Sequence, residues 1–82
     1  MITVKFFAML KKLAGVESRE YELTGPVTLA EFKETLKKDF PALREVLDGR
    51  SVLVSVNQEF ARGDTVLKDG DEVGLLPPFS GG

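Results

Sequence analysis

The stretch TLAEFKETLKKDFP, residues 28–41, decides the fold class. Thr28 and Glu31 have the spacing of a capping box, in which each side chain accepts a hydrogen bond from the backbone N–H of the other residue. Apolar side chains then recur on one helical face, at Leu29, Phe32, Leu36 and Phe40. Because Pro41 cannot continue a helix, the sequence predicts one amphipathic helix that ends near residue 40.

Strand-like segments flank this helix on both sides. Residues 2–6 alternate apolar and polar side chains, which puts Ile2, Val4 and Phe6 on one face. Further elements are predicted as strands over residues 18–23, 51–56, 59–61 and 72–76, a short helix over 10–14 and a helical turn between 41 and 47. Strands around one principal helix predict an α+β domain with a single sheet packed on that helix. If the sheet is mixed, the first and last strands lie at its centre.

The composition excludes most catalytic chemistry. The 82 residues, enough for one domain, include no Cys, His or Trp, and the formal net charge is -2. A thiolate nucleophile, a zinc–thiolate site and the commonest general base are therefore missing. Acidic and basic residues are interspersed, and no apolar run approaches the roughly 20 residues of a membrane span. We expect a cytoplasmic protein without a metal site, a nucleic-acid partner or a membrane association.

The same alternation leaves three apolar side chains outside the core. If the first strand turns its apolar face inward, Phe7 points away from the core or begins the next loop. By the same parity, Leu53 and Leu76 leave the core face of their strands, so all three would lie together on the far side of the sheet. Two interpretations stay open: scattered surface residues, which are common, or a clustered interface for another protein.

An acidic turn precedes the last predicted strand, at Asp69-Gly70-Asp71-Glu72. Carboxylates can bind calcium, but this stretch lacks the loop spacing and the distal glutamate of an EF-hand. A solvated turn is the favoured interpretation. An acidic patch that meets arginines of a partner is the functional alternative.

The sequence ends in Leu76-Pro77-Pro78-Phe79-Ser80-Gly81-Gly82. Two prolines favour an extended exit from the last strand, and two glycines leave the end without side chains. Such an end fits a narrow channel in another protein, with the main-chain carboxylate of Gly82 as the reactive group. An ionised carboxylate is a poor electrophile, so it needs activation, most simply as an acyl-adenylate made from ATP. Because the sequence holds no glycine-rich phosphate loop, ATP would bind to a partner.

With these features the chain resembles a known family, the small sulfur-carrier subunits of molybdopterin synthase, which are ubiquitin-like β-grasp proteins. The residues that carry the resemblance are Val4-Lys5-Phe6-Phe7-Ala8, Leu13-Ala14-Gly15, Val56-Asn57-Gln58, Asp69-Gly70-Asp71-Glu72-Val73 and Pro77-Pro78-Phe79-Ser80-Gly81-Gly82. The resemblance covers essentially the whole chain. It implies a β-grasp domain over residues 1–76 and a flexible extended tail over residues 77–82.

The resemblance also implies that Gly82 carries sulfur. An E1-like adenylating enzyme would couple AMP to Gly82, and a sulfurtransferase with a persulfide would displace AMP and leave a thiocarboxylate. In the large subunit of molybdopterin synthase, that group would donate sulfur to cyclic pyranopterin monophosphate, in molybdenum or tungsten cofactor biosynthesis. The chain itself would bind no cofactor and supply no catalytic side chain. The family suggests a heterotetramer of two small and two large subunits.

By the same resemblance, Gly82 is the site of adenylation and thiocarboxylation, on an arm formed with Gly81 and Ser80. Contacts with partner proteins are implied for Phe7, Leu76, Pro77, Pro78 and Phe79, to which the parity argument adds Leu53. The last strand departs from relatives that carry aromatic residues at Gly74-Leu75-Leu76, which affects the size of this apolar anchor.

Three other functions use the same features and stay open. A ubiquitin-like modifier would join Gly82 to lysines of target proteins. A sulfur carrier of the thiazole pathway would share the fold and the Gly-Gly end. A plain interaction domain would carry an inert tail.

Overall fold

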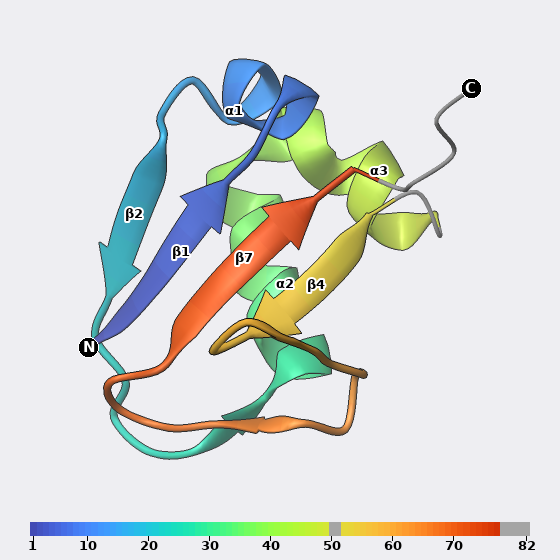
Figure 1. Cartoon of the computed structure of the whole chain (residues 1–82). Helices are drawn as coiled ribbons and strands as arrows, with labels where there is room; N and C mark the ends of the chain where they lie inside the picture. Colours follow the sequence, from blue (N-terminus) through green and yellow to red (C-terminus); the bar gives the residue numbers. More distant parts are fainter. Residues whose placement is uncertain (50–51, 78–82) are drawn as a thin grey trace.

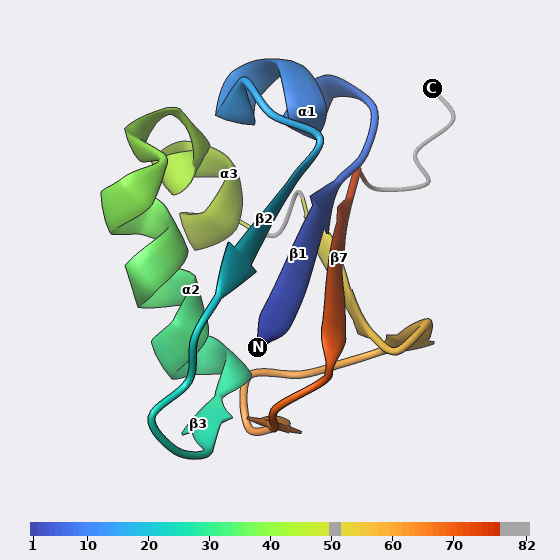
Figure 2. The same ribbon diagram turned by 90° about the vertical axis from the view of Figure 1, so that its left-hand side faces the viewer.

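The computed structural model describes residues 1–49 and 52–77. In chain order, its elements are β1 (Ile2–Phe6), α1 (Met9–Ala14), β2 (Ser18–Tyr21), β3 (Val27–Thr28), α2 (Leu29–Asp39), the 3-10 helix η1 (Pro41–Leu43), α3 (Arg44–Asp48), β4 (Leu53–Val56), β5 (Glu59–Phe60), β6 (Val66–Leu67) and β7 (Glu72–Leu76). The main sheet has the strand order β2-β1-β7-β4-β5, and a small second sheet pairs β3 with β6. Figures 1 and 2 show α2 and α3 on one side of the main sheet. The predicted α+β arrangement, a mixed sheet packed on one main helix, is confirmed.

The centre of the main sheet is the parallel pair of β1 and β7, with Val4 opposite Val73 and Phe6 opposite Leu75. Antiparallel neighbours complete the sheet, because β2 pairs with β1 and β4 pairs with β7. Ile2, Val4 and Phe6 are all buried, as their alternation with polar residues predicts. The first and last strands therefore lie side by side at the centre.

Helix α2 begins and ends where local chemistry predicts. Thr28 Oγ1 accepts a hydrogen bond from the backbone N–H of Glu31 at 3.2 Å, and Glu31 Oε1 accepts one from the N–H of Thr28 at 2.9 Å. At the other end, the N–H of Phe40 donates to the carbonyl of Leu36, and Pro41 opens η1. The predicted turn between residues 41 and 47 is found as η1 followed by α3.

Three predicted strands differ in their bounds from the structure, and the one predicted over residues 59–61 ends at Phe60. The strand predicted over residues 18–23 ends at Tyr21, because the chain then leaves β1 and turns toward β3. The prediction of a single sheet is wrong in one respect, because β3 and β6 form a second sheet. This pair was not predicted, since two-residue strands carry no periodic signal. The strand predicted over residues 51–56 is observed from Leu53 onward, and residue 51 lies outside the described residues.

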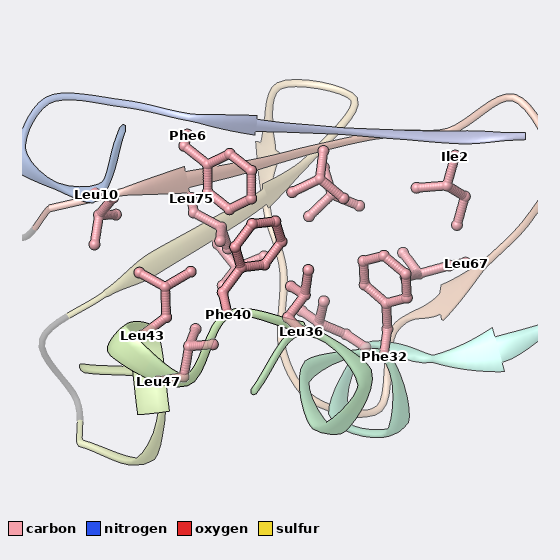
Figure 3. Packing of buried hydrophobic residues seen from close by; sticks show 14 residues of the cluster. Ile2, Phe6, Leu10, Phe32, Leu36, Phe40, Leu43, Leu47, Leu67 and Leu75 are labelled. Atoms are coloured by element: carbon pink, nitrogen blue, oxygen red, sulfur yellow. The ribbon is translucent and has the colours of Figure 1, made fainter. Parts of the chain in front are cut away.

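The core fills the space between the main sheet and α2. Figure 3 shows side chains of β1 and β7 pointing toward those of α2, η1 and α3. Two aromatic pairs join the layers edge to face, Phe6 with Phe40 at 5.1 Å and Tyr21 with Phe32 at 5.2 Å between ring centroids. Within residues 1–49 and 52–77, no helix has the length and apolar character needed to cross a membrane.

Candidate functional site

The candidate docking surface lies at the end of the main sheet where β7 ends. Because β1 and β7 are parallel, β1 ends there too, and β4 begins there because it is antiparallel to β7. Figure 1 shows that the connection from β1 to α1 also lies at this end of the sheet. One end of each of these three strands therefore lies at the same end of the sheet.

The cross-strand register places the predicted contact residues on the outer face, which we define as the face of the main sheet opposite α2. Leu53 pairs directly with Leu76. The N–H of Phe7 donates to the carbonyl of Leu75 at 3.1 Å, which extends the pairing of β1 with β7 by one residue. Phe7 is 43% exposed, and Leu53 and Leu76 are half-buried. The three side chains share the outer face, and their role as partner contacts stays a prediction.

A glycine in β7 makes room for the ring of Phe7. Gly74 pairs with Ser55 on the outer face and is nevertheless buried. A Cβ atom on Gly74 would lie 3.3 Å from Cε2 of Phe7 and 2.6 Å from Oγ of Ser55. The ring therefore lies against β7 at a position that a side chain at residue 74 would obstruct. From the sequence alone, Gly74 was noted only as part of a segment in which relatives carry aromatic residues.

Phe60 extends this surface and was missed by the sequence analysis. It pairs with Ser55, so it shares the outer face, and it is 66% exposed. Asn57 and Gln58, both at positive φ, form the two-residue turn that sets the register of β5. Following the alternation of inward and outward side chains from β4 through this turn into β5 would have placed Phe60 on the outer face. We call the following residues the apolar outer face: Phe7, Leu53, Phe60 and Leu76.

Most of the predicted tail lies outside the described residues: Pro78, Phe79, Ser80, Gly81 and Gly82. Pro77 is described and half-buried, directly after Leu76. The chain therefore leaves the sheet beside the apolar outer face. The domain boundary between residues 76 and 77 stays a prediction.

An ion pair borders the apolar outer face. Lys5 faces outward opposite Gly74, and its Nζ lies 3.1 Å from Oε1 of Glu72. Both side chains are well exposed, so the pair adds little to stability. It does give the apolar surface a polar rim, which is the usual composition of a protein interface.

The acidic turn lies at the opposite end of β7 and serves a structural purpose. Asp71 accepts hydrogen bonds from the backbone N–H of Lys68 at 2.8 Å and from Nδ2 of Asn57 at 3.0 Å. These two bonds hold the pKa of the Asp71 carboxyl below its usual range. Oδ1 of Asn57 accepts in turn from the N–H of Glu72 at 3.0 Å, so the turn is tied to the β4–β5 connection. Among residues 1–49 and 52–77, no group of three or more ligand side chains could hold a metal ion.

Comparison with known proteins identifies the family. The sequence pattern of the ThiS family matches residues 4–82. The chain belongs to the ThiS family. This ThiS-family chain is 35% identical to the molybdopterin synthase sulfur carrier subunit of Chlamydomonas reinhardtii, over 99% of its own length and 98% of that relative. The family resemblance inferred from the sequence motifs is confirmed.

Solved structures support the same placement for this ThiS-family chain. It matches the small archaeal modifier protein 1 from Haloferax volcanii with a TM-score of 0.86 and 31% identity, over 99% of this chain and 98% of that one. It also matches a chain of the complex of subunits 1 and 2 of the molybdopterin-converting factor from Helicobacter pylori, with a TM-score of 0.71 and 29% identity over 99% and 97% of the two chains. The predicted ubiquitin-like β-grasp fold is confirmed.

Proposed function

We propose that this chain is the sulfur-carrier subunit of a molybdopterin synthase and that its reactive group is the main-chain carboxylate of Gly82. The observation that carries the proposal is that the chain leaves the sheet at Pro77, beside the apolar outer face. A partner that binds to the apolar outer face is therefore also next to the point where the tail leaves the sheet. Membership of the ThiS family and the similarity to a molybdopterin synthase sulfur carrier subunit support the same function.

The proposed partner at this face is the large subunit of the synthase. One similar chain of known structure belongs to a complex of subunits 1 and 2 of the molybdopterin-converting factor, which supports such an assembly. The heterotetramer of two small and two large subunits is part of the proposal. An E1-like adenylating enzyme and a persulfide-bearing sulfurtransferase are the other proposed partners. Because activation consumes ATP, the proposal places the chain in the cytoplasm.

The proposed chemistry uses the main chain rather than side chains. An oxygen of the Gly82 carboxylate attacks the α-phosphorus of ATP on the activating partner, and pyrophosphate leaves. A persulfide sulfur then attacks the acyl carbon, AMP leaves, and a thiol reductant cleaves the acyl disulfide to a thiocarboxylate. In the large subunit, sulfur passes to the pyranopterin precursor, and water restores the carboxylate. The lack of Cys and His in the sequence suits a carrier whose partners supply the catalytic groups.

Intact-mass analysis of the protein purified from its own host tests this proposal. A mass increase equal to the exchange of one oxygen for one sulfur, located at Gly82, is the expected result. Conjugates joined through Gly82 to lysines would instead identify a protein modifier. Repeated recovery of the unmodified chain alone would indicate an inert tail.

A reconstituted reaction with ATP, the activating enzyme and a sulfur donor gives the second test. Deletion of Gly81 and Gly82 should abolish sulfur acceptance and leave the circular dichroism spectrum and the melting temperature unchanged, because both residues follow the last core residue, Leu75. The variant Glu45→Gln, at an exposed position of α3, is the matched control and should accept sulfur like the wild type. Sulfur acceptance by the truncated protein would refute the proposed role of Gly82.

A further inference from the structure

Strand β2 forms one edge of the main sheet, and half of its backbone groups have no partner. Figure 2 shows β2 facing the viewer, with β1 as its neighbour in the sheet. The N–H of Phe6 donates to the carbonyl of Glu17 at 2.9 Å, so alternate residues of β2 bond to β1. The N–H and C=O groups of Ser18 and Glu20 therefore point away from β1. Within residues 1–49 and 52–77, these groups accept and donate no hydrogen bond.

A small pocket lies beside this edge, between the end of β2 and the first half of α2. Its volume is about 170 Å³, well below the roughly 300–1,000 Å³ of typical small-molecule sites. The pocket therefore suits one side chain of a partner better than a metabolite. Four of the side chains that line it are predominantly apolar: Tyr21, Leu23, Val27 and Phe32.

Two carboxylates also line the pocket, those of Glu22 and Glu31, and both side chains are exposed. Among the described residues, neither forms an ion pair. Oε1 of Glu31 accepts hydrogen bonds from the N–H and from Oγ1 of Thr28, which hold the pKa of this carboxyl below its usual value. The carboxylate of Glu31 is therefore held in place in its ionised form. Apolar walls with unpaired carboxylates suit a long aliphatic side chain that ends in a cation.

A strand added to β2 would direct a side chain toward this pocket. The ring of Tyr21 lies on the face of β2 that packs on α2, where it meets Phe32 edge to face at 5.2 Å. Residues directly opposite each other in neighbouring strands carry their side chains on the same face. The residue of an added strand opposite Tyr21 therefore points along this ring, while its neighbour pairs with the free backbone groups of Glu20.

The charges at this edge indicate which kind of strand can occupy it. Glu20 and Glu22 are both exposed, so two copies of the chain that paired through β2 would bring like charges together. Charged side chains on an edge strand are a common protection against such self-association. A cationic segment would instead meet unpaired carboxylates. Arginine fits best, because its planar guanidinium can donate to two carboxylates at once.

We propose that the edge of β2 binds an extended segment of a partner protein and that the pocket takes an arginine side chain of that segment. The segment adds a strand to the main sheet through the backbone of Ser18 and Glu20, and its guanidinium pairs with Glu22 and Glu31. Most of the apolar outer face lies on β4, β5 and β7, so the segment leaves that face free. This inference goes beyond the proposed function and does not depend on it.

The test titrates the full, isotope-labelled chain with three synthetic peptides and follows its amide signals by NMR. The first peptide is acetyl-Thr-Val-Thr-Arg-Thr-Val-Thr-amide, in which arginine and both valines share one face of an extended chain. In the second peptide citrulline replaces arginine, which keeps the shape and removes the charge. In the third, the two threonines that flank arginine are N-methylated and cannot donate hydrogen bonds to β2.

The chain is varied in parallel. The double variant Glu22→Gln, Glu31→Gln removes both charges, and glutamine at position 31 still serves a capping box. Glu22→Gln alone gives a second variant that leaves α2 untouched. The matched control is Glu59→Gln, the same change at an exposed position of β5, on the other edge of the sheet.

The arginine peptide should shift the amide signals of residues 18–23 in a saturable way. Loss of the charge, in the citrulline peptide or in the double variant, should weaken binding about fivefold, the upper range for partly exposed ion pairs. Glu22→Gln should weaken it by a smaller factor, and Glu59→Gln should bind like the wild type. The N-methylated peptide should not bind.

Equal affinity for the arginine and citrulline peptides, or wild-type affinity in the double variant and in Glu22→Gln, would refute the recognition of arginine. Full affinity of the N-methylated peptide would refute strand addition. Shifts confined to other surfaces, or no saturable shifts, would overturn the whole inference. A dimer of the free chain in sedimentation, with concentration-dependent shifts at residues 18–23, would identify a second copy as the occupant instead. None of these outcomes bears on the sulfur-carrier function, which the intact mass at Gly82 tests separately.

Discussion

Adding one methyl group at the centre of the outer face should test how tightly Phe7 is packed over β7. In Gly74→Ala, the new Cβ atom would lie 2.6 Å from Oγ of Ser55, closer than such contacts occur in proteins. It would also lie 3.3 Å from Cε2 of Phe7, which has to move by a few tenths of an ångström. The hydroxyl of Ser55 is therefore the principal obstacle, and the ring of Phe7 is the second.

Two opposing effects set the expected size of the change. Overpacking a filled site costs about 1–3 kcal/mol, whereas replacing a strand glycine by alanine gains about 0.5–1 kcal/mol by reducing the freedom of the unfolded chain. We expect Gly74→Ala to lower the free energy of unfolding by roughly 0.5–2 kcal/mol. In a Ser55→Ala background the hydroxyl is gone, so the same substitution should be neutral or stabilise by up to about 0.5 kcal/mol.

Urea unfolding followed by far-UV circular dichroism gives the four free energies of this double-mutant cycle, since the chain has no Trp for fluorescence. The prediction is a coupling energy of about 1 kcal/mol between residues 55 and 74, so that the cost of Gly74→Ala disappears or is reversed in the Ser55→Ala background. An equal cost of Gly74→Ala in both backgrounds would refute the reasoning, because Oγ of Ser55 would then not be the obstacle.

Two further predictions concern the ends of α2 and β7. Thr28→Ala removes the acceptor for the N–H of Glu31 and should lower stability by about 1 kcal/mol in urea unfolding, while Thr28→Ser, which keeps the hydroxyl, should stay close to the wild type. Because the pKa of Asp71 is lowered in the folded state, its stabilising effect is complete above the unfolded-state pKa, near pH 4, and is lost as the pH falls through the folded-state pKa. The free energy of unfolding should therefore fall more steeply below about pH 4 in the wild type than in Asp71→Asn, and parallel pH curves would contradict this role.

Local patterns in the sequence predict the elements that position the site. The ends of α2 follow from a capping box and a proline, both of which act on the neighbouring backbone, so Thr28 and Phe40 are found as its two caps. The alternation around Val4 likewise predicts which face of β1 is buried, because one slip of register would expose the whole apolar set. The same parity predicts that Leu53 and Leu76 share the outer face.

Other features depend on residues that are distant in the chain. Val27 pairs with Leu67 in a two-residue ladder that no local period can reveal. The importance of Gly74 depends on where the ring of Phe7 lies, which the sequence of β7 does not contain. Ala8 has φ 53°, a positive value that alanine rarely adopts, so the local sequence does not reveal this turn.

The central place of β7 has a mechanical consequence for the proposed carrier function, in which partners act on the tail. A strand at the edge of a sheet can be peeled away one hydrogen bond at a time when its end is pulled. β7 is hydrogen-bonded to β1 on one side and to β4 on the other, so a pull along Pro77 has to shear both ladders together. If partner enzymes act on the residues after Pro77 as proposed, a pull on this end of β7 is resisted by two neighbouring strands and not by one.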